Sequence, residues 1–181
     1  QDLTIQTGLT LQAARGQIWN IATGRTFTLD TGVFTRSAAA TLNVQGAGTV
    51  ATTTISNDAT GMIGTWATFG SGATTRYATV NAGIITGFTG TAAATAANVT
   101  DTTGLIHYDV ASVGALGAGA SFNTLRYTGA AGTITGNFTT NGILTSGTGA
   151  LTMSGNIAVG ASRELVLTNG DSNALRNLTL S

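Results

Sequence analysis

The sequence predicts an all-β protein, a right-handed parallel β-helix (β-solenoid) built from short strands. Three observations support this: apolar-polar-apolar triplets recur along the chain, they recur too often for a sandwich, and Thr, Ala and Gly supply 91 of the 181 residues. Alternation with period two in Thr-rich and branched segments is typical of half-buried strands. Helices are not expected, because no stretch carries apolar residues at helical spacing for three turns without a glycine.

The triplets occur throughout the chain, and Gly, Asn or Asp commonly follows them. They are Leu3–Ile5, Leu9–Leu11, Phe27–Leu29, Leu42–Val44, Leu151–Met153, Leu165–Leu167 and Leu178–Leu180. In the first fifty residues, strand-like segments begin near positions 3, 9, 18, 27, 33 and 42. Three such strands per coil give coils of roughly 20 to 25 residues, whereas a sandwich has longer strands and sparser turns. The absence of Pro fits, since inner rungs of a solenoid donate ladder hydrogen bonds almost everywhere.

The segment 57–103 departs from this pattern. Its apolar residues gather in the longer stretches 61–69, 77–80 and 83–88. We predict longer strands or a hairpin-like insertion here, an inserted or projecting β segment within a single solenoid domain that spans 1–181.

Charge and composition exclude several function classes. The chain has seven Arg, no Lys and seven acidic residues, so it offers no basic stripe for nucleic acid or an anionic membrane surface. It has no Cys, which excludes disulfides and Cys-ligated zinc. The uncharged stretch 127–162 is interrupted by Thr, Gly and Asn, so membrane insertion is not expected. The first residue is Gln, which indicates a mature form after leader removal or a fragment.

The sequence contains no convergent set of catalytic or metal-binding residues. The acidic residues are scattered, and only Asp101 with Asp109 and Glu164 with Asp171 lie within ten positions of each other. His107 is the single His, and one interpretation makes it a catalytic base that Asp109 orients. Because the sequence offers no partner nucleophile, we interpret His107 instead as a surface strand residue. Calcium-binding repeats, EF-hand spacing and phosphate loops are also absent from the sequence. We therefore predict no enzyme activity, no cofactor and no metal.

Two further patterns concern the strand faces. Thr-x-Thr pairs at 26–28, 52–54 and 133–135 have the local form of ice-binding solenoid faces. Their separations match no constant coil period, so solvated strand faces are the favoured interpretation. Arg126 and Arg176 each place a guanidinium in strand-like sequence, where it either sets register between subunits or only aids solubility.

Several phrases resemble a known family. The runs 122–127, 142–147 and 151–157, together with the Trp-containing segment 61–69, are similar to autotransporter-associated β-strand repeat proteins, which are large bacterial surface proteins. The resemblance implies a secreted β-helical protein without a catalytic motif.

The leading hypothesis is an extracellular structural protein on the cell surface, forming a stalk, fibre or surface filament by stacking of β-helical units. Both ends of the sequence read polar-apolar-Thr-apolar-polar, which predicts head-to-tail self-association. The predicted contact residues are Leu3, Ile5, Leu178 and Leu180. The alternative is an adhesin or glycan-binding module, in which Trp66, Phe69, Tyr77 and Phe88 project and contact sugars.

Overall fold

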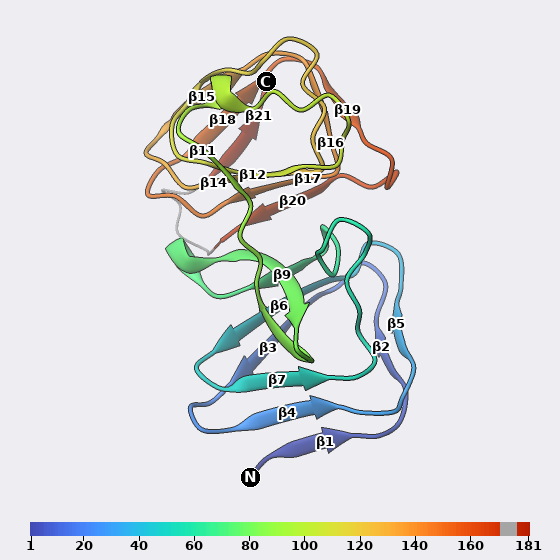
Figure 1. Cartoon of the computed structure of the whole chain (residues 1–181). Coiled ribbons are helices and arrows are strands. Elements are labelled where there is room, and N and C mark those ends of the chain that lie inside the picture. The colour runs from blue at the N-terminus through green and yellow to red at the C-terminus, as the bar shows by residue number, and fades with distance from the viewer. Residues whose placement is uncertain (171–176) are drawn as a thin grey trace. The chain divides into compact units, whose positions relative to one another are not determined.

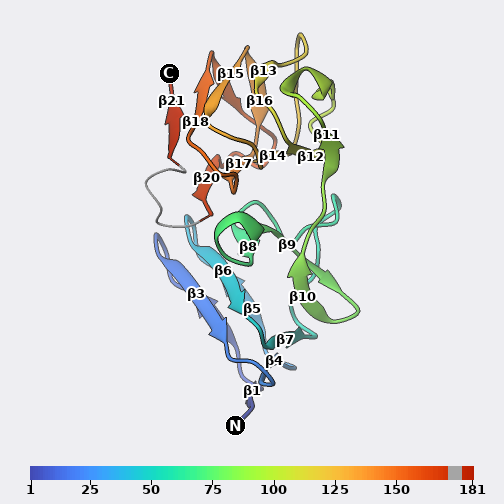
Figure 2. The same cartoon turned by 90° about the vertical axis from the view of Figure 1, so that its left-hand side faces the viewer.

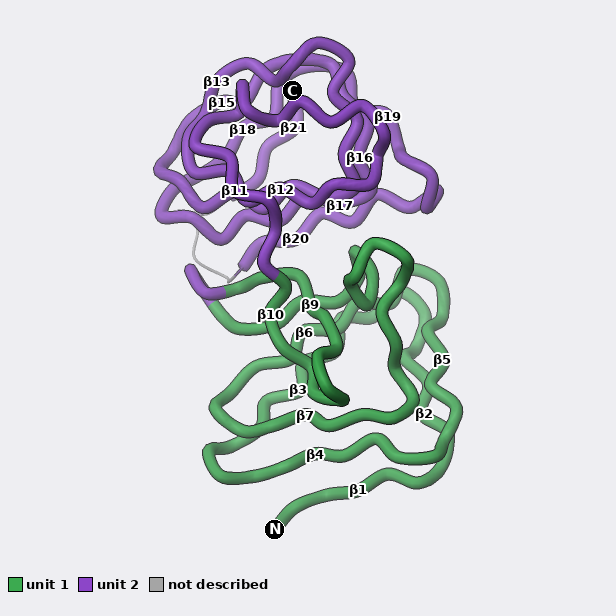
Figure 3. Tube along the Cα trace, viewed as in Figure 1, with its two compact units in different colours: residues 1–71, 75–88 green, residues 72–74, 89–181 purple. Residues whose placement is uncertain are grey.

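The computed structural model describes residues 1–170 and 177–181, and these form a β-solenoid of about seven turns. The predicted all-β parallel solenoid of short strands is therefore confirmed. The chain divides into two compact units (Figure 3): unit 1 contains residues 1–71 and 75–88, and unit 2 contains 72–74 and 89–181. Among the described residues the helical elements are two single 3-10 turns, η1 (Gly72–Thr74) and η2 (Ala96–Asn98).

Unit 1 begins with coils that each carry three short strands, coloured blue to teal in Figure 1. The strands are β1 (Leu3–Ile5), β2 (Leu9–Leu11), β3 (Gly16–Ile21), β4 (Thr26–Leu29), β5 (Phe34–Arg36), β6 (Thr41–Gly46), β7 (Thr49–Thr52) and β8 (Ala67–Phe69). They stack in parallel as β1-β4-β7, β2-β5 and β3-β6-β8. Leu3 is aligned with Phe27 and Leu9 with Phe34, so the length of these coils agrees with the prediction.

An antiparallel hairpin closes the last coil of unit 1. Strands β9 (Arg76–Asn81) and β10 (Ile84–Gly87) pair with each other, and their connection Ala82-Gly83 has positive φ at both residues. Strand β10 also pairs with β7, and β9 pairs with β8, both antiparallel. The hairpin lies within the segment 57–103, and it joins two faces of the solenoid into one eight-stranded sheet.

Unit 2 is a parallel solenoid with shorter coils. Its strands are β11 (Thr91–Ala93), β12 (His107–Val110), β13 (Gly114–Ala115), β14 (Thr124–Tyr127), β15 (Gly132–Thr135), β16 (Phe138–Thr140), β17 (Gly142–Thr145), β18 (Leu151–Ser154), β19 (Ile157–Val159), β20 (Val166–Asn169) and β21 (Leu178–Leu180). The faces are β11-β12-β14-β17-β20, β13-β15-β18-β21 and β16-β19, and Figure 2 shows β15, β18 and β21 side by side. Thr91 is aligned with Tyr108 and His107 with Thr124, so these coils are shorter than predicted.

Each unit has its own apolar core, made by the inward residue of each alternating pair. Strand β18, for example, alternates buried and half-buried residues along its length. The core of unit 2 includes the fully buried Leu125, Ile143 and Met153, and that of unit 1 includes Leu42 and Val50. Several core positions are Ala, because the interior of a coil is narrow; they are Ala40, Ala67, Ala78, Ala93, Ala96 and Ala120.

Candidate functional site

The first coil of unit 1 leaves apolar side chains without a covering layer. In the register of the sheet, Leu3 continues the column that contains Phe27, and Ile5 continues the column that contains Leu29. Phe27 and Leu29 are 9% and 3% exposed, whereas Leu3 is 58% exposed. Strand β1 pairs with β4 on one side, and no described strand pairs with its other edge. The inward column therefore ends at an open strand edge.

The last coil of unit 2 is open in the same way. Leu180 stands in register with Met153, and Leu167 stands in register with Ile143. Met153 and Ile143 are fully buried, but Leu180 and Leu167 are 44% and 45% exposed. Leu178 is half-buried and continues the column of a fully buried Leu one coil earlier. Thus three inward Leu side chains lie at the end of the core, where the preceding coil packs against one side of each.

A hollow of about 450 Å³ lies between β20 and β21 on this last coil. Its described lining is Leu167, Thr168, Asn169, Asn177, Leu178 and Thr179. The described lining residues are apolar or neutral polar, and none of them is charged. Such a surface suits another β-coil better than an ionic ligand.

The two open ends contrast with the hairpin end of unit 1. There, antiparallel β9 and β10 occupy the edges of β8 and β7. A reversed strand pair interrupts the run of parallel rungs and protects the edges that would otherwise template further strands. The structure thus places the predicted residues Leu3, Ile5, Leu178 and Leu180 on two edge strands, β1 and β21, each of which has one edge that pairs with no described strand.

The predicted aromatic row is not an exposed row. Tyr77 is 3% exposed and belongs to the interior, so the prediction that its ring contacts a ligand is wrong. Trp66, Phe69 and Phe88 are half-buried. The Trp66 ring stacks on Phe34 with centroids 6.0 Å apart, and the Arg36 guanidinium lies 5.2 Å from its centroid. These intramolecular contacts occupy the ring surface that would otherwise stack on a sugar.

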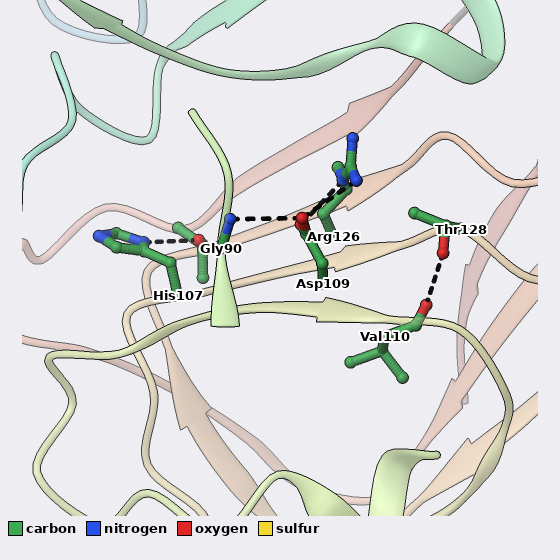
Figure 4. A network of polar contacts seen from close by, with 7 residues as sticks. Gly90, His107, Asp109, Val110, Arg126 and Thr128 are labelled. Atoms are coloured by element: carbon green, nitrogen blue, oxygen red, sulfur yellow. Dashed lines mark hydrogen bonds and ion pairs between the residues drawn. The ribbon is translucent and has the colours of Figure 1, made fainter. Parts of the chain in front are cut away.

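A polar cluster lies on the face of unit 2 that contains β12 and β14 (Figure 4). Arg126 donates two hydrogen bonds to Asp109, from Nε to Oδ1 at 2.8 Å and from Nη2 to Oδ2 at 3.1 Å. The Gly90 N–H, one coil earlier, donates to Asp109 Oδ2 at 3.3 Å. Asp109 and Arg126 are direct partners in the sheet register. This bidentate pair joins three successive coils and neutralises its own charges, which is the geometry of a structural tie. Arg176, the other Arg singled out from the sequence, lies outside the described residues.

His107 differs from the sequence-based interpretation of an exposed strand residue. Its ring is 5% exposed, with Nδ1 2.7 Å from Thr124 Oγ1 and Nε2 3.4 Å from Asn123 Nδ2. Asn141 then donates to Asn123 Oδ1 at 2.8 Å, so amides stack from coil to coil. A histidine beside a hydroxyl resembles a base and its nucleophile, but Thr124 is 1% exposed and offers no access to a substrate.

Sequence reasoning missed a repeated turn that holds two acidic residues. The motif Asp-x-Thr-Gly occurs at 58–61 in unit 1 and at 101–104 in unit 2. In each copy one carboxylate oxygen accepts hydrogen bonds from the backbone N–H and the hydroxyl of the Thr two residues later. Asp101 also accepts from the N–H groups of Leu105 and Ile106. Burial raises the pKa of the Asp101 carboxyl, but these hydrogen bonds outweigh burial and hold the pKa below its ordinary value. The motif itself, repeated at 58 and 101, is the signal that could have found these turns.

Comparisons with protein-family models, curated proteins and solved structures found no match to this chain. The resemblance to autotransporter-associated repeat proteins accordingly stays a prediction. Within the described part of the chain, no three His, Asp or Glu side chains gather as metal ligands. No helix in that part has the length and apolar character needed to cross a membrane.

Proposed function

We propose that this chain is an extracellular structural protein whose β-coils stack end to end into a stalk, fibre or surface filament. The observation that carries the proposal is the pair of open ends, where inward apolar columns stop at unpaired strand edges. Leu3 at one end and Leu180 at the other are about half exposed, although their neighbours in the same columns are buried. Another β-coil is the surface that covers such columns and pairs such edges at the same time.

Coil length favours a coil of this same chain as the partner. The first coil of unit 1 is long, since Leu3 is aligned with Phe27. Most coils of unit 2 are shorter, as the pairing of His107 with Thr124 shows, but its last coil lengthens again, from Leu151 to Leu178. The last coil of unit 2 is therefore closer in length to the first coil of unit 1 than to most other coils of unit 2.

Stacking of β21 on β1 would continue the ladder with a rung spacing of about 4.8 Å. Burying the exposed half of a Leu side chain contributes about 1 kcal/mol, so Leu3, Leu167, Leu178 and Leu180 together favour each junction appreciably. The contact joins two different surfaces, so its repetition from copy to copy adds units in one direction, and we propose that it generates a filament. The same pairing chemistry serves separate copies of the chain and successive segments of a longer polypeptide.

The test is electron microscopy and sedimentation of the 181-residue protein and two variants. Leu178→Asp combined with Leu180→Asp puts two charges on the inward side of β21. The control, Thr179→Asp, puts one Asp on the exposed side of the same strand, between the two substituted positions. We expect filaments from the parent chain and from the control, and folded monomers from the double variant, with folding checked by circular dichroism. Monomeric parent protein, or filaments that survive in the double variant, would overturn the proposal.

A further inference from the structure

The outward side of the sheet β13-β15-β18-β21 carries a two-column array of hydroxyl groups. The register aligns Thr133, Thr152 and Thr179 in one column. In the second column Thr135 is aligned with Ser154, and Ser181 follows because its backbone bonds both to Met153 and to Gly155. Three neighbouring strands thus present Thr-x-Thr, Thr-x-Ser and Thr-x-Ser on one face. Figure 2 shows these strands, β15, β18 and β21, next to one another.

Sequence spacing conceals this array. The step along the chain from Thr133 to Thr152 is shorter than the step from Thr152 to Thr179, so no constant period joins the three rows. Loops absorb the difference, and the strands remain in register. The objection drawn from the sequence, that the Thr pairs follow no coil period, therefore does not apply to this face.

The six hydroxyl groups are available to an external partner. All six side chains are exposed or half-buried, and none makes a hydrogen bond to another described side chain or backbone group. The three strands contain no charged or aromatic residue; their sequences are GTIT, LTMS and LTL. The inward residues Ile134, Leu151 and Met153 are fully buried, so the face rests on a packed core.

The geometry of a parallel sheet sets the spacing of the hydroxyls. Neighbouring strands lie about 4.8 Å apart, and alternate residues of one strand lie about 6.6 Å apart. Each Thr presents a methyl group beside its hydroxyl, with restricted χ1. The result is a rectangular lattice of six hydroxyl groups, and the four from Thr each have a methyl group beside them. The two spacings of this lattice are close to repeat distances between oxygen atoms in ice.

Unit 1 carries a smaller group of aligned Thr residues. On the outward side of β1-β4-β7, Thr26 is aligned with Thr49, and Thr4 is aligned with Thr28. Thr28 is aligned with Ala51 on the next strand, so this array is smaller than the one in unit 2.

We propose that the hydroxyl face of β15, β18 and β21 binds ice. The array holds a layer of water in ice-like positions, and this layer joins the surface of a growing crystal. A crystalline polysaccharide is the less suitable occupant, because recognition of sugars at a flat surface relies on aromatic rings and this face has none. An anionic surface is unsuitable because the face has no positive charge. The inference is separate from the proposed filament, since the face belongs to one chain.

The experiment measures thermal hysteresis and adsorption to ice crystals by the 181-residue protein. Thr152 occupies the middle row, so Thr152→Tyr raises a bulky ring from the centre of the face. The matched control is Ala158→Tyr, which adds the same ring at an exposed position on the β16-β19 face of the same unit. A second variant, Thr152→Val, preserves shape and removes one hydroxyl.

We expect the parent chain and Ala158→Tyr to adsorb to ice and to show thermal hysteresis. Thr152→Tyr should abolish both, and Thr152→Val should weaken both, with folding verified by circular dichroism. The proposal is overturned if the parent chain shows neither effect, if Ala158→Tyr loses as much as Thr152→Tyr, or if the parent chain adsorbs to insoluble cellulose or chitin and not to ice.

Discussion

Two alanine substitutions in one inward column provide the most direct test of the open core end. Ile134, Met153 and Leu180 occupy this column on successive coils. Met153 is fully buried, so Met153→Ala removes packed atoms and leaves a cavity, at a cost of about 2 to 5 kcal/mol. Leu180 is 44% exposed, so its side chain gains only about half of the roughly 1.5 to 3 kcal/mol of full burial, and its removal leaves no closed cavity. Leu180→Ala should therefore cost about 1 kcal/mol.

Urea unfolding followed by circular dichroism checks this difference. Both tryptophans, Trp19 and Trp66, belong to unit 1, so their fluorescence serves as a reference signal from the unit that is not mutated. The free energies should be taken from dilute, monomeric protein with the slope of the transition unchanged. Equal losses for Met153→Ala and Leu180→Ala would refute the reasoning, because they would mean that the end of the column is already covered.

Three further predictions concern the polar groups. The pKa of Asp101 is lowered in the fold, so the stability that this carboxylate provides is present above about pH 4 and is lost as the pH falls through the folded-state pKa. In denaturation midpoints measured against pH, Asp101→Asn should therefore reduce the loss of stability at acidic pH. Burial raises the pKa of Tyr127, so its stabilising contribution is present below about pH 10 and is lost at higher pH. In the same measurement Tyr127→Phe should remove this loss of stability at alkaline pH. At neutral pH the substitution should cost about 1 kcal/mol, because the hydrogen bond from the Tyr127 hydroxyl to Ala130 O is lost. Asp109→Asn should cost about 1.5 to 3 kcal/mol, and a double-mutant cycle with Arg126→Gln should show that most of this loss is shared between the two residues.

Much of the local structure could be predicted from alternation alone. The triplets Leu3–Ile5, Leu9–Leu11 and Leu178–Leu180 are strands with the predicted bounds. Alternation also shows which side chains face inward, because the period of a strand is fixed at two. It does not show accessibility, which is why His107 was expected at the surface and is instead packed against Thr124 and Asn123.

Long-range arrangement was less predictable, for a physical reason. Loops between strands tolerate changes in length, so the coils of unit 2 differ in length while the strands keep their register. The sequence therefore concealed the alignment of Thr133, Thr152 and Thr179. The partnership of Asp109 with Arg126 likewise depends on a coil shorter than the spacing expected from the start of the chain.

The hairpin β9-β10 also has a consequence for the order of folding. Its strands are joined by two residues, Ala82 and Gly83, whose positive φ values suit the tight turn that antiparallel strands need. Every parallel pair in unit 1 must instead close a full coil, such as that from Leu3 to Phe27, before its first rung forms. Hairpins form within about 1 to 10 μs, so this pair is the fastest nucleus available in unit 1. We therefore expect the coils to assemble on β9 and β10 one after another, with β1 the last strand to join.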